Sequence, residues 1–167
     1  MKKIFTLLAL IISFSMNAQM DDNSANNNSA TGTYAVAMGY STEASGNYST
    51  AMQRNTTASG YASTAMGFYT TASGNYSTAM GYGTTASDYG SLVIGQYNSS
   101  GSSVTNSAIS FSTSNTAFVI GNGTASNAKS DAFKVMFNGD ATIGNDAIIG
   151  NDLTVSGDVV VSSDARL

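Results

Sequence analysis

The chain has 167 residues, of which only 10% are charged, and it contains no Cys, His, Pro or Trp. Without His and Cys it lacks the usual nucleophile triads, the common metal ligands and the ordinary general base at neutral pH, so we expect no enzymatic activity, no metal site and no cofactor. The formal net charge of −4 argues against nucleic acid as a partner.

Residues 1–18 have the pattern of a secretory signal peptide. Lys2 and Lys3 precede an apolar run at 4–14, and Ala18 suits a cleavage site. The run is too short to span a bilayer, so we expect no membrane span in the mature chain. Without the two Lys, four basic residues remain against ten acids, a net charge of −6. Residues 19–33 are polar and aperiodic, which predicts a disordered leader.

Residues 34–96 repeat with a period of 14. Ala-Met-Gly recurs from Ala37 and Ala-Ser-Gly from Ala44, and the two series interleave at seven residues. A short fixed period predicts a solenoid, and the abundance of Gly and Thr excludes a coiled coil. Each half-repeat fits one short strand and a tight turn. Gln53 and Asp88 stand where the pattern expects Gly, and we interpret both as local drift.

Alternate residues of a strand point to opposite faces, which separates an inner from an outer set. Ala is the only residue type that recurs on both strands, so we place it inside a narrow roll. This leaves an apolar column on the outside, which a second copy of the chain would cover as a trimer interface. The alternative is a Met-lined core with Ala outside. The column consists of Met38, Met52, Met66, Met80 and Ile94.

These repeats resemble the head repeats of YadA-like trimeric autotransporter adhesins. The resemblance implies an all-β fold, a left-handed parallel β-roll solenoid of 14-residue repeats, assembled as a parallel homotrimer. It also implies adhesion outside the cell, secreted or at the surface and associated with the outer membrane of a Gram-negative bacterium. The surface ligand is unknown, with a glycan or a matrix protein as the two classes considered.

Aromatic residues recur at two repeat positions and form candidate binding ladders, because Tyr is amphipathic and frequent at interfaces. The alternative is that they only pack over the turns and across a trimer. One position holds Tyr34, Tyr48 and Tyr76, and the other holds Tyr40, Phe68 and Tyr82.

The 14-residue phase ends after residue 96. We expect a loop at 97–116 and a β connector at 117–135, followed by a β stem of six-residue period at 136–167. Five Asp residues recur in this stem, at Asp140, Asp146, Asp152, Asp158 and Asp164. They suit turn aspartates that bond the backbone, or a calcium ladder. A hexapeptide acyltransferase helix is a third interpretation, although that family relies on a His that this chain lacks.

The last residues resemble the junction at which the peptidase S74 intramolecular chaperone domain of phage fibres begins. In that family the chain is cut between Ser and Asp, here Ser163 and Asp164. We expect no cleavage in the absence of the folded chaperone.

Taken together, the sequence predicts a secreted or cell-surface trimeric adhesin. Two other classes stay open: a fibre or tail-spike-like structural protein, and an ice-binding β-solenoid that uses the ladders from Thr50 and Thr57.

Overall fold

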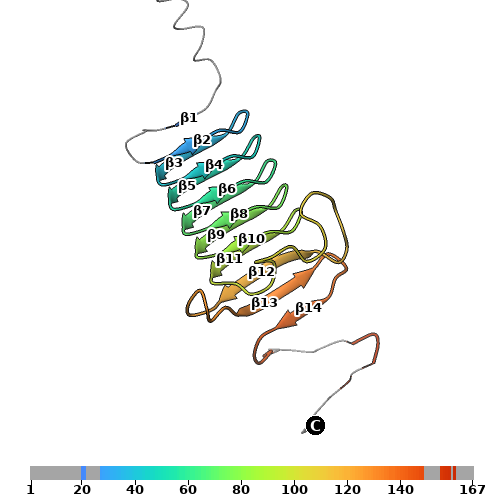
Figure 1. Cartoon of the computed structure of the whole chain (residues 1–167). Helices are drawn as coiled ribbons and strands as arrows, with labels where there is room; N and C mark the ends of the chain where they lie inside the picture. The colour runs from blue at the N-terminus through green and yellow to red at the C-terminus, as the bar shows by residue number, and fades with distance from the viewer. Residues whose placement is uncertain (1–19, 22–26, 149–154, 159, 161–167) are drawn as a thin grey trace, which may run out of the picture.

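The computed structural model describes residues 20–21, 27–148, 155–158 and 160. These residues contain strands, turns and loops but no helix, and they form a parallel β-solenoid of about five turns, drawn as a stack of coils in Figure 1. The predicted all-β solenoid of 14-residue coils is confirmed. The predicted signal peptide at 1–18 lies outside the described residues.

Each regular coil contributes one long and one short strand to two different sheets. In the larger sheet, the two-residue strand β1 (Met20–Asp21) is followed by the long strands, all paired in parallel in the order β3 (Val36–Tyr40), β5 (Thr50–Arg54), β7 (Thr64–Phe68), β9 (Thr78–Tyr82), β11 (Leu92–Gln96) and β12 (Thr116–Asn122). The short strands pair in the order β2 (Ser29–Ala30), β4 (Glu43–Ala44), β6 (Thr57–Ala58), β8 (Thr71–Ala72) and β10 (Thr85–Ala86).

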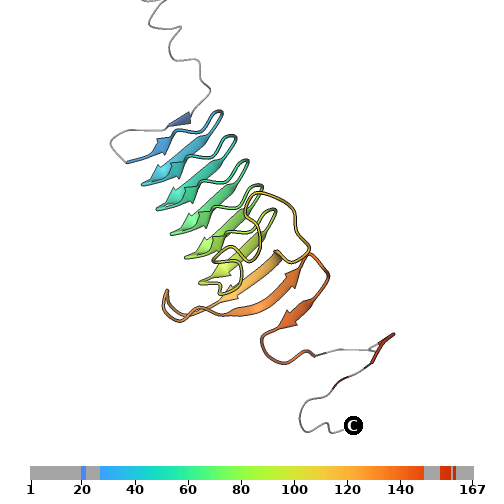
Figure 2. The ribbon, with the colours of Figure 1, turned by 45° about the vertical axis from the view of Figure 1, so that its right-hand side comes forward.

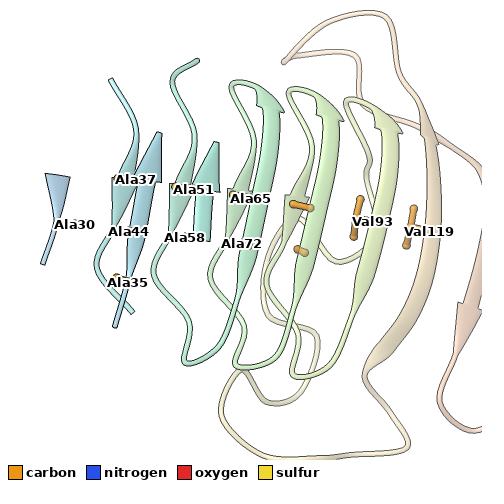
Figure 3. Packing of buried hydrophobic residues seen from close by; sticks show 12 residues of the cluster. Ala30, Ala35, Ala37, Ala44, Ala51, Ala58, Ala65, Ala72, Val93 and Val119 are labelled. Atoms are coloured by element: carbon orange, nitrogen blue, oxygen red, sulfur yellow. The ribbon is translucent and has the colours of Figure 1, made fainter. Parts of the chain in front are cut away.

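The interior of the roll is lined by small side chains from both sheets. Ala37, Ala51, Ala65 and Ala79 are in register along one sheet and face the Ala ladder of the other, and all are fully buried. Val93 and Val119 take over this column in the last two coils (Figure 3). The rest of the lining comes from the buried Ser and Thr side chains that occupy the same repeat positions as Ser49 and Thr56. The Ala ladders therefore lie inside, as predicted.

Close contact between neighbouring coils explains one of the glycine columns. A Cβ on Gly46 would lie 2.0 Å from Gly60 O, and a Cβ on Gly60 would lie 2.1 Å from Gly74 O. These distances are far below any van der Waals contact, so a larger residue has to push two coils apart. The turn after each short strand therefore requires Gly wherever another regular coil follows.

Asparagine side chains close both ends of the short-strand sheet. At the first coil, Asn28 Oδ1 accepts hydrogen bonds from the Thr42 backbone N–H (3.2 Å) and hydroxyl (2.9 Å). At the last coil, Asn98 Oδ1 accepts from Thr85 N (2.8 Å) while its Nδ2 donates to Thr85 O (2.8 Å). The Asn98 amide thus replaces the peptide group of a missing neighbouring strand, which satisfies the backbone of β10.

Asp88 has a structural role that the sequence-based interpretation as drift missed. Its carboxylate is fully buried, with Oδ1 accepting from Thr105 N (2.6 Å) and Oδ2 from Thr116 N (2.8 Å). At Gly74 a side chain would collide with the backbone of the next coil. No regular coil follows Asp88, so a side chain fits at this position. Asp88 therefore attaches the 97–115 loop and the start of β12 to the last repeat. Gln53 keeps its place in the register with a positive φ of 86°.

The loop at 97–115 folds back along the last coils (Figures 1 and 2). Ser87 N donates to Gly101 O, Tyr89 N to Ser107 O and Asn75 N to Ala108 O. These bonds agree with the predicted loop at 97–116, with Thr116 already in β12.

The strand motif returns in β12, which pairs in parallel with β11 so that Val119 is opposite Val93. The chain then reverses into the antiparallel strands β13 (Asp131–Met136) and β14 (Ala141–Ile143). The Asn138-Gly139 turn makes this hairpin, with Gly139 at φ 94°. The first six-residue unit therefore forms a hairpin and not a repeating coil, which differs from the predicted stem. Asp152 and the Ser163–Asp164 junction lie outside the described residues.

The predicted disordered leader at 19–33 also needs correction. Ser29–Ala30 form β2, which pairs with β4, and Met20–Asp21 form β1 on the edge of the larger sheet. The segment has no 14-residue period in its sequence, but Ala30 and Asn28 are buried against the first regular coil. The solenoid therefore begins before residue 34.

We expect Gly60→Ala to destabilise the solenoid by about 3 kcal/mol or more, because steric strain of this kind belongs to the most damaging class of substitution. The midpoint of thermal unfolding, followed by far-UV circular dichroism, should fall clearly. Gly157→Ala is the matched control, since nothing lies within 4 Å of its added Cβ. Equal midpoints for the two variants would contradict the coil-contact argument.

We expect Asp88→Asn to loosen the 97–115 loop while leaving the repeats folded, since one backbone N–H then meets a donor instead of a carboxylate oxygen. A hydrogen bond to a charged group contributes about 1.5–3 kcal/mol, so the rate of chymotrypsin cleavage at Phe111 should rise roughly tenfold or more. An Asp140→Asn variant, altered at an exposed turn, should be cut at the wild-type rate. No difference between the variants would show that Asp88 does not hold the loop.

Candidate functional site

The larger sheet carries an apolar column on its outer face. Met38, Met52, Met66 and Met80 pair in register, and Ile94 pairs with Ile120 further along. These side chains are half-buried in the single chain, whereas the Ala residues between them are fully buried. Met therefore lies outside and Ala inside, so the alternative of a Met-lined core is wrong.

A shallow apolar hollow interrupts this face at the third and fourth coils. Its lining includes Met side chains, glycines within strands β7 and β9, and Arg54. The lining residues are Gln53, Arg54, Met66, Gly67, Phe68, Met80 and Gly81. The hollow is open and mostly apolar, a shape that suits the side chains of a second protein surface better than a small enclosed ligand.

The first aromatic edge lies at the last residue of each of the long strands β3, β5, β7 and β9. Tyr40, Arg54, Phe68 and Tyr82 are in register there. The Arg54 guanidinium lies 5.6 Å from the Tyr40 ring centroid and 5.1 Å from that of Phe68, which is cation–π distance on both sides. Phe68 stacks on Tyr82 at 5.3 Å. The predicted residues Tyr40, Phe68 and Tyr82 therefore form one edge, into which Arg54 is inserted.

Two further tyrosines extend this first edge, and the sequence analysis missed both. The Tyr69 ring contacts Phe68 at 4.4 Å and the Tyr97 ring contacts Tyr82 at 5.0 Å. The hydrogen bond with the Tyr82 side chain raises the pKa of the Tyr97 phenol above its ordinary value.

The turn that precedes each long strand carries a second aromatic edge, here named the tyrosine edge. The predicted residues Tyr34, Tyr48 and Tyr76 lie on it and each is more than half exposed. Tyr61 and Tyr89 lie there as well and make the ladder continuous, although they occupy the preceding position in the repeat. A search for one Tyr in each 14-residue repeat, at either of these two adjacent positions, would have found Tyr61 and Tyr89.

The Thr ladders considered for ice binding are also placed by the register. Thr57, Thr71 and Thr85 form a column on the outer face of the short-strand sheet, where Glu43 occupies the same position one coil earlier. Each of the three Thr side chains is half-buried. Thr50, Thr64 and Thr78 lie instead beside the Met column on the larger sheet. The Thr residues are thus divided between two faces and form no single flat array.

Acidic groups do not gather in the described part of the chain. Within it, no three His, Cys, Asp or Glu side chains lie close enough together to hold a metal ion. Asp140 of the predicted ladder accepts a hydrogen bond from the Asn138 side-chain amide (2.7 Å), a side-chain partner instead of the predicted backbone one. Nor does any helix in this part of the chain have the length and hydropathy needed for a membrane span.

Comparison with known families agrees with this geometry over the repeat region. A family model described as the YadA head domain repeat (2 copies) matches residues 30–52, 58–84 and 72–98. Residues 30–98 carry YadA head repeats. The matches begin at Ala30, in agreement with β2, and end at Asn98, the residue that caps β10. No curated protein matches the chain, and neither does any solved structure.

The YadA head repeats account for the coils but not for the segment that follows them. The 97–115 loop and the β12–β14 strands lie beyond the last match. YadA-like heads occur in trimeric adhesins exposed at the cell surface, which agrees with an adhesin-like function for the repeat region.

Proposed function

We propose that this chain is a secreted or cell-surface adhesin-like protein whose left-handed YadA head repeats assemble as a parallel homotrimer. In this assembly the head attaches to host tissue, to a surface or to neighbouring cells. The secretory pattern of residues 1–18 supports export, and the repeats support association with the outer membrane of a Gram-negative bacterium. The proposal assigns no enzymatic activity and no cofactor.

The Met column is the observation that carries this proposal. It is apolar, continuous over four coils and half-exposed in the single chain, so it favours a partner that covers it. A partner whose apolar side chains have the same spacing as the coils can contact every Met of the column. A second copy of the chain has that spacing. Three copies around one axis bring the columns together, and each chain retains its two aromatic edges and its short-strand sheet.

The composition supports attachment through neutral contacts. Between residues 23 and 128 the only charged residues are Glu43, Arg54 and Asp88, and Asp88 is buried. Long-range electrostatic attraction therefore contributes little, and binding depends on hydrogen bonds and aromatic contact. Three identical heads in one particle multiply a weak contact, because linked sites raise the effective concentration.

Attachment is tested with fluorescent beads that carry the full chain, passed over cultured cells, bare glass and a layer of the same protein. Retention on at least one of the three should exceed that of albumin-coated beads. Met66→Asp should reduce retention about tenfold or more, because three carboxylates near one axis disrupt the trimer and its avidity. Thr71→Asp, an equally half-buried position on the other sheet, is the matched control.

Retention equal to albumin on all three surfaces would contradict the adhesive function. Equal loss of retention in Met66→Asp and Thr71→Asp would contradict the role of the Met column while leaving adhesion in place.

A further inference from the structure

The tyrosine edge presents one Tyr per coil over five consecutive coils. The rings contact one another in sequence, with centroids 5.3 to 5.4 Å apart. Four of the five are exposed by 40 to 56% of their surface. The ladder consists of Tyr34, Tyr48, Tyr61, Tyr76 and Tyr89. It is a continuous aromatic strip along the solenoid axis. It lies on the turns before the long strands, whereas the first aromatic edge, which contains Arg54, lies at the other end of these strands.

Three of these tyrosines occupy strained backbone positions. Tyr34, Tyr48 and Tyr76 have φ values of 57°, 60° and 58°, a region in which a bulky residue is an outlier. Gly90 takes the same turn position one coil further on, with φ 69°. Strain of this kind costs on the order of 1 kcal/mol or more per residue and concentrates at functional sites. The turn itself would be satisfied by Gly, so the rings point to a use outside the fold.

Side-chain amides lie within the same strip. Asn47 and Asn75 occupy the repeat position of Tyr61, one coil to either side of it. Their Oδ1 atoms accept hydrogen bonds from Thr33 N (3.0 Å) and Tyr61 N (2.9 Å), which fixes both amides. Neither Nδ2 group has a hydrogen bond within the described part of the chain. Each can therefore donate to a ligand hydroxyl.

Aromatic rings, amide donors and phenol hydroxyls without charge suit a neutral sugar. The C–H faces of a pyranose pack on an aromatic ring, and its hydroxyls pair with amides and phenols. A protein ligand would also use exposed Tyr, but the interleaved amide donors along a straight strip favour a polymer rich in hydroxyls.

The ring orientations narrow the class of sugar. From Tyr48 to Tyr89 each ring is turned by 67° to 68° from the next, and Tyr48 and Tyr76 share one repeat position while Tyr61 and Tyr89 share the position before it, so the same position returns every second coil. Two strand spacings correspond to roughly 9.6 Å. In a β-1,4-linked glycan each sugar is rotated by half a turn from the one before it. The same face therefore returns at every second sugar, at a distance similar to the spacing of two coils. An α-linked glycan coils and loses this alignment.

We propose that the tyrosine edge binds β-1,4-linked neutral polysaccharide lying along the solenoid axis. This inference rests on the proposed adhesive function and names the ligand of one edge of the head. The contacts come from the exposed rings of the ladder and the free Nδ2 groups of Asn47 and Asn75, and a trimer presents three such strips.

The test uses the full chain with cellohexaose and chitohexaose as probes and maltohexaose as the α-linked control. Binding is measured by isothermal titration calorimetry and by tyrosine fluorescence, which is informative because the chain has nine Tyr and no Trp. Both β-linked probes, or one of them, should bind, and maltohexaose should not.

The ladder is interrupted with residues that the repeats themselves use at these positions. Tyr61→Asn copies Asn47 and Asn75, and Tyr76→Ala copies Ala62, which has a φ of 50° at that position. The double variant should keep the wild-type circular dichroism spectrum and lose affinity about tenfold or more, as expected when central aromatic contacts are removed. The matched control on the opposite edge, Tyr69→Asn with Tyr82→Gln, copies Asn55 and Gln96 and should bind as the wild type does.

Three results would overturn the proposal: no binding of either β-linked probe, equal binding of maltohexaose, or equal loss in the two double variants. If the beads adhere while no oligosaccharide binds, the sugar inference fails and the adhesive function stands. If the beads do not adhere either, the function itself fails.

Discussion

The close spacing of successive coils is the constraint on which the rest of the structure depends. Parallel strands stack about 4.8 Å apart, and the two sheets of the roll lie so near each other that Ala, Ser and Thr line the interior, with Val only in the last two coils. The same spacing leaves no room for a side chain at Gly60, whose missing Cβ faces the next coil's carbonyl. A methyl-sized group contributes only about 0.8 kcal/mol on burial, so this interior provides little hydrophobic stabilisation per coil.

The limited interior explains why the outer surfaces carry the larger side chains. Met66 and its counterparts lie outside because the roll cannot hold them, and they supply the apolar area that the interior lacks. Five inner hydroxyls, those of Ser49, Thr56, Ser63, Thr70 and Thr84, have no hydrogen-bond partner in the described chain, which adds a further cost to the isolated coil. Both facts mean that the interior contributes little to the stability of the isolated roll, which supports the proposed association. At the ends of the stack, the side chains of Asn28, Asn98 and Asp88 accept hydrogen bonds from backbone N–H groups.

Much of this architecture could be predicted from the sequence, because a 14-residue period leaves few folds open. The Ala ladders and the outward Met column were both predicted. The Asp88 contact was missed because its partners, Thr105 and Thr116, belong to an aperiodic loop, and aperiodic contacts leave no trace in a repeat analysis. The first coil was missed for a similar reason, since Ser29–Ala30 precede the recognisable period.

The aromatic edges were predicted only in part. Tyr34, Tyr48 and Tyr76 share one repeat position and were found by period alone, whereas Tyr61 and Tyr89 sit one residue earlier. The ladder becomes continuous because adjacent turn positions bring rings into the same space, a property of the fold and not of the period. The cation–π position of Arg54 between Tyr40 and Phe68 likewise depends on the coil register.

The central claim is that the Met column is covered by other copies of the chain, and the native mass tests it most directly. Light scattering after size exclusion should give three times the mass of the single mature chain for the wild type. Met66→Asp should give the mass of one chain, with its β circular dichroism spectrum retained. A folded wild-type monomer, soluble at concentrations well above those of the adhesion assay, would contradict the account.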